Sequence, residues 1–385
     1  MILGIDASNI SVGGGLTHLK AILRSVDIEK HDIEKIVIWS SENTLNEIEE
    51  RHWLKKCSEP VMEKNYLQRA LWQHKKLNFK LTKEKCDILF VPGGVFTTKF
   101  RPVVTMSTNL IPFELNEMLR YGLSLLTFKF LLLRFFQSVS FKKANGTIFL
   151  TKNAKDSVLK VTKSLKGATE VISHGIDKKF FLPPRPQKII NEFSIEIPFQ
   201  VLYVSTIEPY KHHHQVIDAT AKVRNKGFPL VLKLIGSGNS AELNRLKKKI
   251  NNVDPDGKIM KYKGFVSHEE LPSEYFAANI FLFASSCENM PITLMEGMAS
   301  GVPIVCSDRG PMSEVLGDAG EYFDPENADS IALAIQTLIE SPELRAKKAK
   351  MAFEQAQRFS WSRCSTETFS FLSHILDDYK KNNLA

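Results

Sequence analysis

Cysteine is scarce in this chain of 385 residues, and no two of its cysteines form a C-x-x-C pair. The number of cysteines is odd, and they stand far apart along the sequence: Cys57, Cys86, Cys287, Cys306 and Cys364. A disulfide-stapled scaffold is therefore excluded as the main interpretation. We expect reduced, buried thiols in a cytosolic compartment.

Two membrane-related patterns are also missing. The start of the chain, 1–6, has no basic stretch followed by an apolar one, so we expect no secretion signal. The most apolar stretch, 121–136, is interrupted by Lys129 and Arg134. A bilayer span needs about 20 consecutive apolar residues, so a transmembrane helix is not expected there.

What the chain does have is an ordinary globular composition, with 43% hydrophobic and 24% charged residues. This excludes a disordered or collagen-like chain. The net charge is +8, and it is local: residues 120–169 hold ten Lys or Arg against one acidic residue, Asp156. Such a local surplus predicts an anionic partner, which could be a phosphorylated ligand, a membrane surface or a nucleic acid.

The stretch 121–136 is expected to be a helix, and two interpretations of it stay open. It is either an ordinary buried helix whose Lys and Arg side chains reach outward, or an interfacial helix on anionic lipid. In the second case Phe128, Lys129, Arg134 and Phe135 would contact the membrane. Nucleic-acid binding ranks third, because no helix-turn-helix, zinc or RNP-type pattern accompanies the charge.

Strand-like and helix-like segments alternate in both halves of the chain, which predicts parallel sheets covered by helices. The expected strands are 2–6, 35–39, 87–91, 103–106 and 147–150, then 200–204, 230–235, 259–261, 280–284 and 303–307. The proline-rich stretch 183–198 can continue neither a helix nor a central strand, so it is the expected linker.

The predicted fold class is therefore α/β, with two Rossmann-like, doubly wound parallel-sheet domains facing a central cleft. We expect an N-terminal domain over 1–185 and a C-terminal domain over 198–362. In such sheets ligands bind at the carboxyl ends of the strands, which directs attention to the loops there.

One such loop is 285–299, which leaves a predicted buried strand and enters a helix. Backbone N–H groups at a helix start lack partners within the helix and suit an anion or sugar hydroxyls. Thr293 and Glu296 have the spacing of a capping box, which by itself would explain both residues. Glu288 has no such structural explanation, and a carboxylate in such a loop either binds a polar ligand or is simply solvated.

A second loop, 205–214, contains Lys211, which could reach a phosphate from a strand-to-helix turn. The three histidines at 212–214 do not predict a metal site, because adjacent side chains diverge and no acidic or Cys partner has metal-site spacing. Gly13, Gly14 and Gly15 follow the first strand and would let a ligand approach the backbone. No Walker lysine follows them, so an ATP-hydrolysing P-loop is not expected.

Taken together these loops resemble the retaining glycosyltransferases of family 4, which have the GT-B fold. Glu288 and Glu296 match the E-x7-E element of that family, and the resemblance continues through 298–303. The stretches 171–177 and 264–266, the glycine loop and Lys211 match as well. The resemblance covers most of the chain, and the C-terminal stretch 363–385 is then expected to pack back on the N-terminal domain.

The resemblance implies a role for each matched residue. Glu288 would contact the donor sugar near the reacting centre, Lys211 would neutralise the diphosphate, and Glu296 would hold the ribose. No cofactor or metal would be needed, because fixed cations and amides stabilise the leaving group. The implied donor-binding residues are Gly14, Gly15, Thr206, Lys211, Asn289, Met290, Pro291, Ile292, Thr293 and Glu296.

The chain also departs from the family pattern. Thr206 stands where relatives usually have an arginine, so the diphosphate would have one cation fewer unless Arg309 or a nearby histidine replaces it. Many relatives carry a histidine in an N-terminal strand-end loop. The matching loop here, 107–109, contains no histidine. The expected acceptor-binding residues are Thr108, Asn109 and His174.

The implied activity is transfer of a sugar from a UDP- or GDP-sugar to a glycan or lipid-linked acceptor, in surface polysaccharide biosynthesis. Relatives that act on lipid-linked acceptors favour the interfacial interpretation of 121–136. We therefore expect a cytoplasmic protein that contacts the anionic inner face of the plasma membrane and no nucleic acid. Two alternatives stay open: a sugar-nucleotide epimerase or phosphorylase on the same fold, and a non-catalytic protein that binds anionic lipid.

Overall fold

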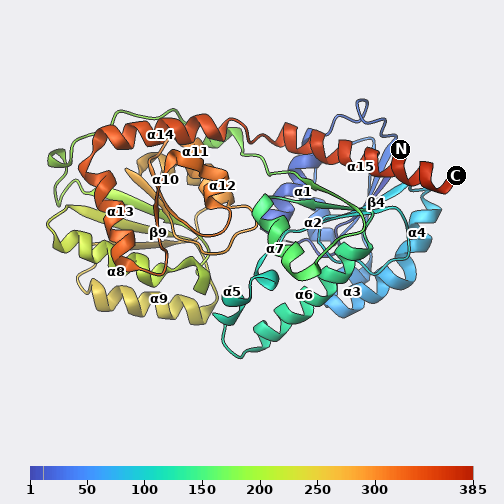
Figure 1. The fold of residues 1–385 in the computed structure, drawn as a ribbon, viewed down its shortest axis with the longest axis horizontal. Helices are drawn as coiled ribbons and strands as arrows, with labels where there is room; N and C mark the ends of the chain where they lie inside the picture. Colours follow the sequence, from blue (N-terminus) through green and yellow to red (C-terminus); the bar gives the residue numbers. More distant parts are fainter. Residues whose placement is uncertain (12, 385) are drawn as a thin grey trace. The chain divides into compact units, whose positions relative to one another are not determined.

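The computed structural model describes residues 1–11 and 13–384, which divide into two compact units. The first unit holds Met1–Leu115, Leu123–Gly175 and the chain from Ser360 onwards, and the second holds Asn116–Gly122 and Ile176–Phe359. Each unit is a parallel sheet with helices packed on it (Figure 1). Neither unit is therefore one continuous stretch of sequence.

The first unit is built on a seven-stranded sheet with the order β3-β2-β1-β4-β5-β6-β7, in which all neighbours pair in parallel. The order reverses direction between β1 and β4, as in a doubly wound sheet. The strands are β1 (Ile2–Asp6), β2 (Lys35–Trp39), β3 (Leu54–Cys57), β4 (Ile88–Val91), β5 (Val103–Met106), β6 (Gly146–Phe149) and β7 (Ala168–Val171).

The second unit repeats this plan in a six-stranded parallel sheet with the order β10-β9-β8-β11-β12-β13. Here the order reverses between β8 and β11. The strands are β8 (Phe199–Val204), β9 (Leu230–Ile235), β10 (Met260–Gly264), β11 (Ile280–Phe283), β12 (Ile304–Ser307) and β13 (Gly320–Phe323). The prediction of two doubly wound parallel-sheet domains is confirmed.

The central strands form because they are short, continuous apolar runs that helices cover on both faces. Every residue of β4 and of β11 is buried. In the second unit α8 (His213–Asn225) contacts α9 (Ser240–Val253) and α13 (Ala328–Glu340). In the same unit α11 (Ile292–Ala299) contacts α12 (Met312–Leu316) and α14 (Pro342–Ala356).

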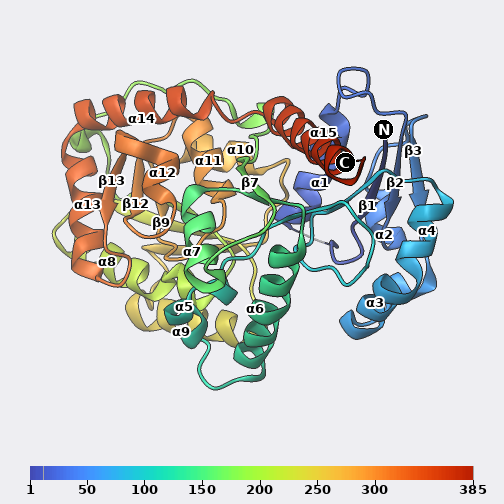
Figure 2. The same ribbon diagram turned by 45° about the vertical axis from the view of Figure 1, so that its right-hand side comes forward.

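In the first unit the C-terminal helix α15 (Trp361–Leu384) packs against α1 (Gly14–Ser25), as Figure 2 also shows. α6 (Leu125–Lys143) contacts α7 (Lys152–Thr162). The remaining helices are short: α2 (Glu42–Asn46), α3 (Tyr66–Trp72), a π-helical turn (Gln73–Leu77), α4 (Asn78–Lys83), α5 (Leu115–Leu119) and α10 (Leu271–Ala277). No described helix has both the length and the apolar character that a membrane span requires.

The units divide at other points than the proline-rich stretch that we expected to be the linker. Residues 183–198 belong to the second unit, where the buried Arg345 of α14 holds them by donating to Gln187 Oε1 (3.2 Å) and to the Lys188 carbonyl. The chain changes unit after Gly175 and again after Phe359. Proline stiffens this stretch, but its packing on α14 decides where it belongs.

The helix that we expected over 121–136 is also shifted. α6 begins at Leu125, where the Ser124 hydroxyl accepts from the Thr127 N–H (3.2 Å), and it continues to Lys143. Gly122 has a φ of 65°, a left-handed conformation that glycine adopts without strain. Tyr121 and Gly122 therefore lie outside the helix, and both belong to the second unit.

Candidate functional site

The candidate site lies in the second unit, at the carboxyl ends of β8 and β11. These two strands are neighbours at the point where the strand order reverses. A sheet of this kind opens a crevice there, because the following connections leave toward opposite faces. The loop after β8 contains Lys211, and the loop after β11 contains Glu288.

Lys211 and Glu288 form an ion pair between Lys211 Nζ and Glu288 Oε1. Both side chains are shielded, with 9% and 15% of their surface exposed. Lys211 Nζ also lies 5.0 Å from the centre of the Tyr210 ring and 5.5 Å from that of Phe283. A cation over aromatic rings is further stabilised by their quadrupoles. The two residues that we predicted to be catalytic thus lie together in the structure.

A side chain of strand β8 holds the backbone at Lys211. Tyr203 of β8 donates from its hydroxyl to the Lys211 carbonyl at 2.6 Å, and burial raises the pKa of this tyrosine. Lys211 itself ends a short 3-10 turn, Pro209–Lys211, and His212 follows in the left-handed region with a φ of 51°. A non-glycine residue in this conformation is uncommon and often marks a functional loop.

Ser286 joins the two loops to each other. Its N–H donates to the Tyr210 carbonyl at 2.9 Å, and its hydroxyl lies 2.9 Å from His212 Nε2. The same hydroxyl donates to Glu117 Oε2 at 2.8 Å. Glu117 in turn accepts from Arg120 Nε at 2.7 Å. The loop that presents Glu288 is therefore anchored by α5, which comes from the N-terminal half of the sequence.

Glu296 does not have the capping role that we expected for it. α11 begins at Ile292 with Pro291 as its N-cap and no side-chain cap, so Thr293 lies inside the helix and the predicted capping box is wrong. Instead the Tyr275 hydroxyl lies 3.0 Å from the Thr293 carbonyl and 3.2 Å from Glu296 Oε2, and it can donate to either. His268 Nε2 lies 3.2 Å from Glu296 Oε1. The carboxylate is thus held by residues of α10 and of the loop after β10.

The stretch between the two glutamates forms the entry into α11. Asn289, Met290 and Pro291 are buried, and Ile292 and Thr293 are partly exposed. The first N–H groups of any helix have no partner within it and carry partial positive charge. The predicted donor-binding residues 289–293 therefore lie where a helix begins, next to backbone N–H groups with partial positive charge.

The candidate replacements for the missing arginine carry no unpaired positive charge in this structure. Thr206 is exposed. Arg309 lies 3.0 Å from an oxygen of Asp324 and 3.2 Å from one of Asp308, so two carboxylates offset it. Burial lowers the pKa of His212 to about 4 and that of His213 to about 3, so both are neutral at neutral pH.

The three adjacent histidines point to different partners rather than to one centre. His212 contacts Ser286, whereas His213 Nε2 lies 3.2 Å from the Ser205 hydroxyl and its ring stacks on Tyr203 at 4.9 Å. All three also line one cavity of about 210 Å³, together with Glu208 and Arg120, but their ring nitrogens have no common partner among the described contacts. The divergence that we predicted for adjacent residues is what the structure has.

The other predicted site residues lie in the first unit. Gly14 and Gly15 begin α1, after Gly13 with a φ of 70°. Thr108 and Asn109 follow β5, where Asn109 Oδ1 accepts from the Ile111 N–H at 3.1 Å. His174 is 4% exposed and packs against His18 and Trp361. Their roles toward a donor or an acceptor stay predictions.

Sequence reasoning missed Glu117, Arg120 and Tyr121, all from the short segment 116–122. Tyr121 donates from its hydroxyl to Glu208 Oε2 at 3.1 Å, and Arg120 also pairs with Glu326. Nothing in the local pattern of 116–122 signals that it belongs to the second unit. Sequence reasoning also missed Tyr275 and His268, although His268 follows the stretch 264–266 that carries the family resemblance.

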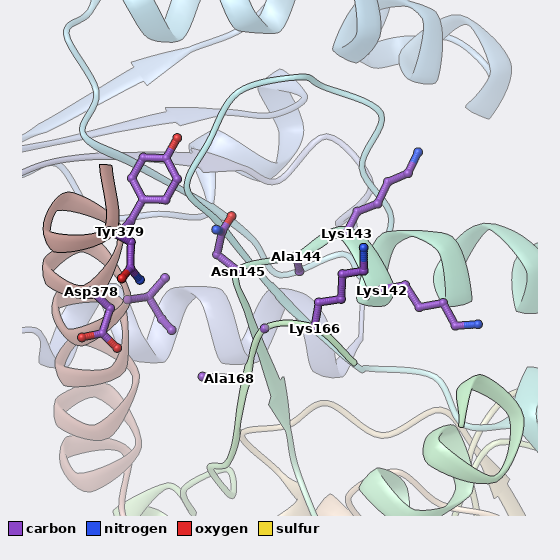
Figure 3. A pocket seen from close by; sticks show the side chains of 11 residues that line it. Lys142, Lys143, Ala144, Asn145, Lys166, Ala168, Asp378 and Tyr379 are labelled. Carbon is purple, nitrogen blue, oxygen red and sulfur yellow. The ribbon is translucent and has the colours of Figure 1, made fainter. Parts of the chain in front are cut away.

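A larger cavity, of about 590 Å³, lies in the first unit and is shown in Figure 3. It opens at the amino ends of β6 and β7, away from the loops at the carboxyl ends. The residues that line it include Lys142, Lys143, Asn145, Lys166, Asp378 and Tyr379. It is basic on one side, but its lysines are the ends of surface side chains, so size alone does not make it the candidate site.

The helix α6 presents an apolar surface to solvent. Phe128 is 59% and Phe135 61% exposed, and Lys129 is exposed between them. Arg134 is only partly exposed, and its Nη1 is buried. Further exposed apolar residues on this helix are Leu125, Leu126, Leu131, Leu132 and Phe136. An exposed patch of this extent is uncommon on a protein with no partner there.

The part of the chain that holds the candidate site also matches a protein family. Residues 184–355 match the family model described as Glycosyl transferases group 1. This stretch is therefore similar to the group 1 glycosyltransferases. It includes both loops of the site, with Lys211, Glu288 and Glu296.

Curated proteins that are similar to this chain match it over part of their length. O-antigen chain mannosyltransferase B of Escherichia coli is 30% identical over 199 residues, which are 49% of this chain and 50% of that protein. A D-inositol 3-phosphate glycosyltransferase of Corynebacterium aurimucosum is 25% identical over 206 residues, 51% of this chain and 49% of that protein. The chain thus spans about half the length of these relatives.

Solved structures match almost the whole chain in fold. Sucrose-phosphate synthase from Thermosynechococcus elongatus has a TM-score of 0.75 at 17% identity, over 98% of this chain and 100% of that one. WaaG, a glycosyltransferase involved in lipopolysaccharide biosynthesis, has a TM-score of 0.71 at 13% identity, over 97% and 99%. HepE of Anabaena in complex with UDP has a TM-score of 0.70 at 18% identity, over 97% and 99%. The chain therefore has the GT-B fold of these structures.

Proposed function

We propose that this protein is a retaining glycosyltransferase that moves a sugar from a nucleoside-diphosphate sugar to a glycan or lipid-linked acceptor. The observation that carries the proposal is the Lys211–Glu288 ion pair, shielded between the two loops that flank the switch point of a unit similar to the group 1 glycosyltransferases. The bound UDP in the HepE structure and the O-antigen and lipopolysaccharide roles in the names of two relatives support the substrate classes. Retention follows from the family resemblance.

In this proposal Lys211 and the entry into α11 receive the diphosphate. As the bond from sugar to phosphate breaks, negative charge grows on the leaving oxygen. The Lys211 ammonium and the first N–H groups of α11 stabilise that charge without having to reorganise. Because these groups are part of the chain, the proposed transfer uses no metal cofactor.

Glu288 and Glu296 then have separate tasks. Before the donor binds, the ion pair keeps the side chains of Lys211 and Glu288 in place. When the donor binds, Lys211 pairs with the diphosphate instead, and the Glu288 oxygens accept from the sugar hydroxyls. Glu296, fixed by Tyr275 and His268, accepts from the ribose hydroxyls. A carboxylate with two supporting partners keeps one orientation, which gives specificity for a nucleoside.

The membrane contact belongs to the same proposal. The exposed face of α6, with Phe128 and Phe135 on either side of Lys129, would lie in the headgroup region of an anionic bilayer. This would hold the protein at the inner face of the plasma membrane, next to a lipid-linked acceptor. The basic surplus of 120–169 adds attraction to such a surface.

The test is transfer of a labelled sugar from UDP- and GDP-sugars to lipid-linked and soluble glycan acceptors. We expect Lys211→Met and Glu288→Gln to lower kcat by about 100-fold or more. Lys222→Met is the matched control, because its exposed pair with Asp329 lies in the same unit outside the site. Full activity of both site variants would overturn the assignment.

Two further arms separate the alternatives. Product formation from the donor alone would indicate an epimerase, and a requirement for inorganic phosphate would indicate a phosphorylase. Calorimetric titration with UDP and with GDP asks whether the protein binds a nucleotide at all. Binding of anionic vesicles without any affinity for either nucleotide would indicate a non-catalytic lipid-binding protein.

A further inference from the structure

Three side chains that commonly bind metals meet inside the first unit, apart from the candidate site. They are His18 of α1, His174 of the loop after β7, and Cys364 of α15. The Nδ1 atoms of the two histidines are 3.0 Å apart, and Cys364 Sγ is 4.0 Å from His18 Nδ1. One ligand atom from each residue lies within 4.8 Å of the other two.

All three residues are buried, with exposures of 1%, 4% and 0%. The 3.0 Å between the two Nδ1 atoms is a hydrogen-bond distance, so without an ion one imidazole N–H donates to the other ring. A neutral imidazole and a thiolate are the forms of these side chains that bind a metal ion.

Hydrogen bonding leaves this cluster incomplete. His18 Nε2 is buried with no hydrogen-bond partner, although most buried polar atoms in proteins have one. The ring of Trp361 also packs here, with its centre 5.5 Å from that of His174 and 6.1 Å from that of His18. An ion bound at the Nδ1 atoms would leave His18 Nε2 as the N–H, so the convergence of the three ligand atoms is what indicates an ion.

The spacing fits one small ion. With metal–nitrogen bonds of about 2.0–2.1 Å and metal–sulfur bonds of about 2.3 Å, tetrahedral ligand atoms stand about 3.3 Å (N to N) and about 3.6 Å (N to S) apart. The distances of 3.0 and 4.0 Å are within about 0.5 Å of these values. The ligand atoms of His174 and Cys364 lie within 4.8 Å, so rotation of the side chains has to bring this pair closer for an ion to bind.

We propose that His18, His174 and Cys364 bind one soft, closed-shell d10 cation, Zn²⁺ or Cu⁺. Two imidazoles and a thiolate are ligands that such ions favour over carboxylate-binding ions such as Mg²⁺ or Ca²⁺. On binding, a metal–sulfur bond replaces the S–H bond and the proton passes to solvent, with no change of oxidation state. Cu⁺ would form a neutral three-coordinate complex, whereas Zn²⁺ would retain one positive charge and take a fourth ligand.

Such an ion would tie together three distant parts of the first unit. His174 is adjacent to Gly175, after which the chain enters the second unit, and Cys364 lies just after its return at Ser360. The ion would hold both of these points to α1. Its role is thus structural, and it does not depend on the proposed transfer reaction.

The test uses the purified full-length chain after treatment with a chelator. It is titrated with Zn²⁺, with Co²⁺ as a spectroscopic probe of a zinc-type site, and anaerobically with Cu⁺. We expect one equivalent of ion, a thiolate-to-cobalt charge-transfer band for a zinc-type site, and a rise in Tm. Uptake of Cu⁺ alone, without Zn²⁺ or Co²⁺, assigns the site to Cu⁺.

Variants then locate the bound ion. Cys364→Ser should abolish the cobalt band or the Cu⁺ uptake, and His18→Gln should weaken binding at least about tenfold. Cys306→Ser is the matched control, because Cys306 is equally buried but lies in the second unit. No stoichiometric uptake by the folded wild type, or full uptake by Cys364→Ser, would overturn the proposal. The wild-type titration needs no variant, so misfolding of a variant cannot obscure the result.

Discussion

Glu296 is held by two side chains, Tyr275 and His268. Tyr275 is fully buried, and its hydroxyl lies within hydrogen-bond distance of Glu296 and of the Thr293 carbonyl. Removing this hydroxyl would leave the carboxylate in place but free to rotate. The effect should therefore be on recognition of the ribose, which is remote from the reacting bond.

We expect Tyr275→Phe to raise the donor KM about fivefold, the worth of one lost hydrogen bond, with kcat little changed. Steady-state kinetics with varied donor concentration measures both values. Tyr322→Phe is the control, because it removes a half-buried hydroxyl that donates to the Gly317 carbonyl elsewhere in the unit. A fall in kcat at unchanged KM would instead place Tyr275 in the chemical step.

Buried neutral histidines make stability depend on pH. The pKa values of His174 and His212 are lowered to about 4 and that of His213 to about 3, whereas an unfolded histidine titrates near 6.5. Between these values the unfolded chain binds more protons than the folded one, so the free energy of unfolding falls as pH falls. The stabilisation is complete above pH 6.5 and is lost below it.

Urea unfolding at pH 7.5 and at pH 5.5 measures this dependence. Each such histidine lowers the free energy of unfolding by up to about 1.4 kcal/mol per pH unit below 6.5. His213→Gln should flatten the dependence, while His52→Gln, a change of an exposed residue, should leave it unaltered. Equal slopes for wild type and His213→Gln would contradict the assignment.

At the scale of elements, most strands could be predicted from the sequence because they are continuous apolar runs. The limits of β1, β2, β5 and β9 agree with the prediction to the residue. The edge strands β3 and β13 were not predicted, since Leu54–Cys57 contains two lysines and Gly320–Phe323 is only partly buried. Edge strands carry such residues because one side of them has no strand neighbour.

The helix α6 leads to a prediction about membranes. We expect binding to vesicles that contain anionic lipid, weakened at least tenfold in Phe128→Ser/Phe135→Ser, because about 1.5–3 kcal/mol is associated with burying each ring. Lys129→Glu should weaken binding mainly at low salt. Phe79→Ser, which removes a 70% exposed ring from α4, is the control. Unchanged vesicle binding of the double variant would show that α6 serves another purpose.

At the scale of the whole molecule, the two loops of the candidate site were predictable but their support was not. The rule that ligands bind at the carboxyl ends of strands points to Lys211 and Glu288 from sequence alone. No local pattern predicts that Glu117, far away in the sequence, accepts from Ser286. Long-range pairs of this kind depend on the tertiary packing of 116–122, which propensities and spacing do not encode.

We expect Glu117→Ala to lower transfer activity about tenfold or more while the protein stays folded. The change leaves Ser286 without one partner and Arg120 without one of its two carboxylate partners, so the loop that presents Glu288 loses its anchor. Glu114→Ala is the control, because Glu114 comes just before this segment in the sequence but belongs to the first unit. Activity and circular dichroism are measured together, and full activity of Glu117→Ala would show that the loop holds itself.

The segment Asn116–Gly122 belongs to the second unit although it lies in the N-terminal half of the sequence, and this matters for ancestry and for engineering. Two-module enzymes are often thought to diversify by recombination, with one half exchanged at a single splice point. A chimera spliced at Gly175 would bring a foreign copy of this segment to the native Ser286 and Glu208. A functional exchange of such halves therefore has to keep the segment together with the second unit that it contacts. Chimeras that retain the native residues 116–122 should be more active than simple fusions at Gly175.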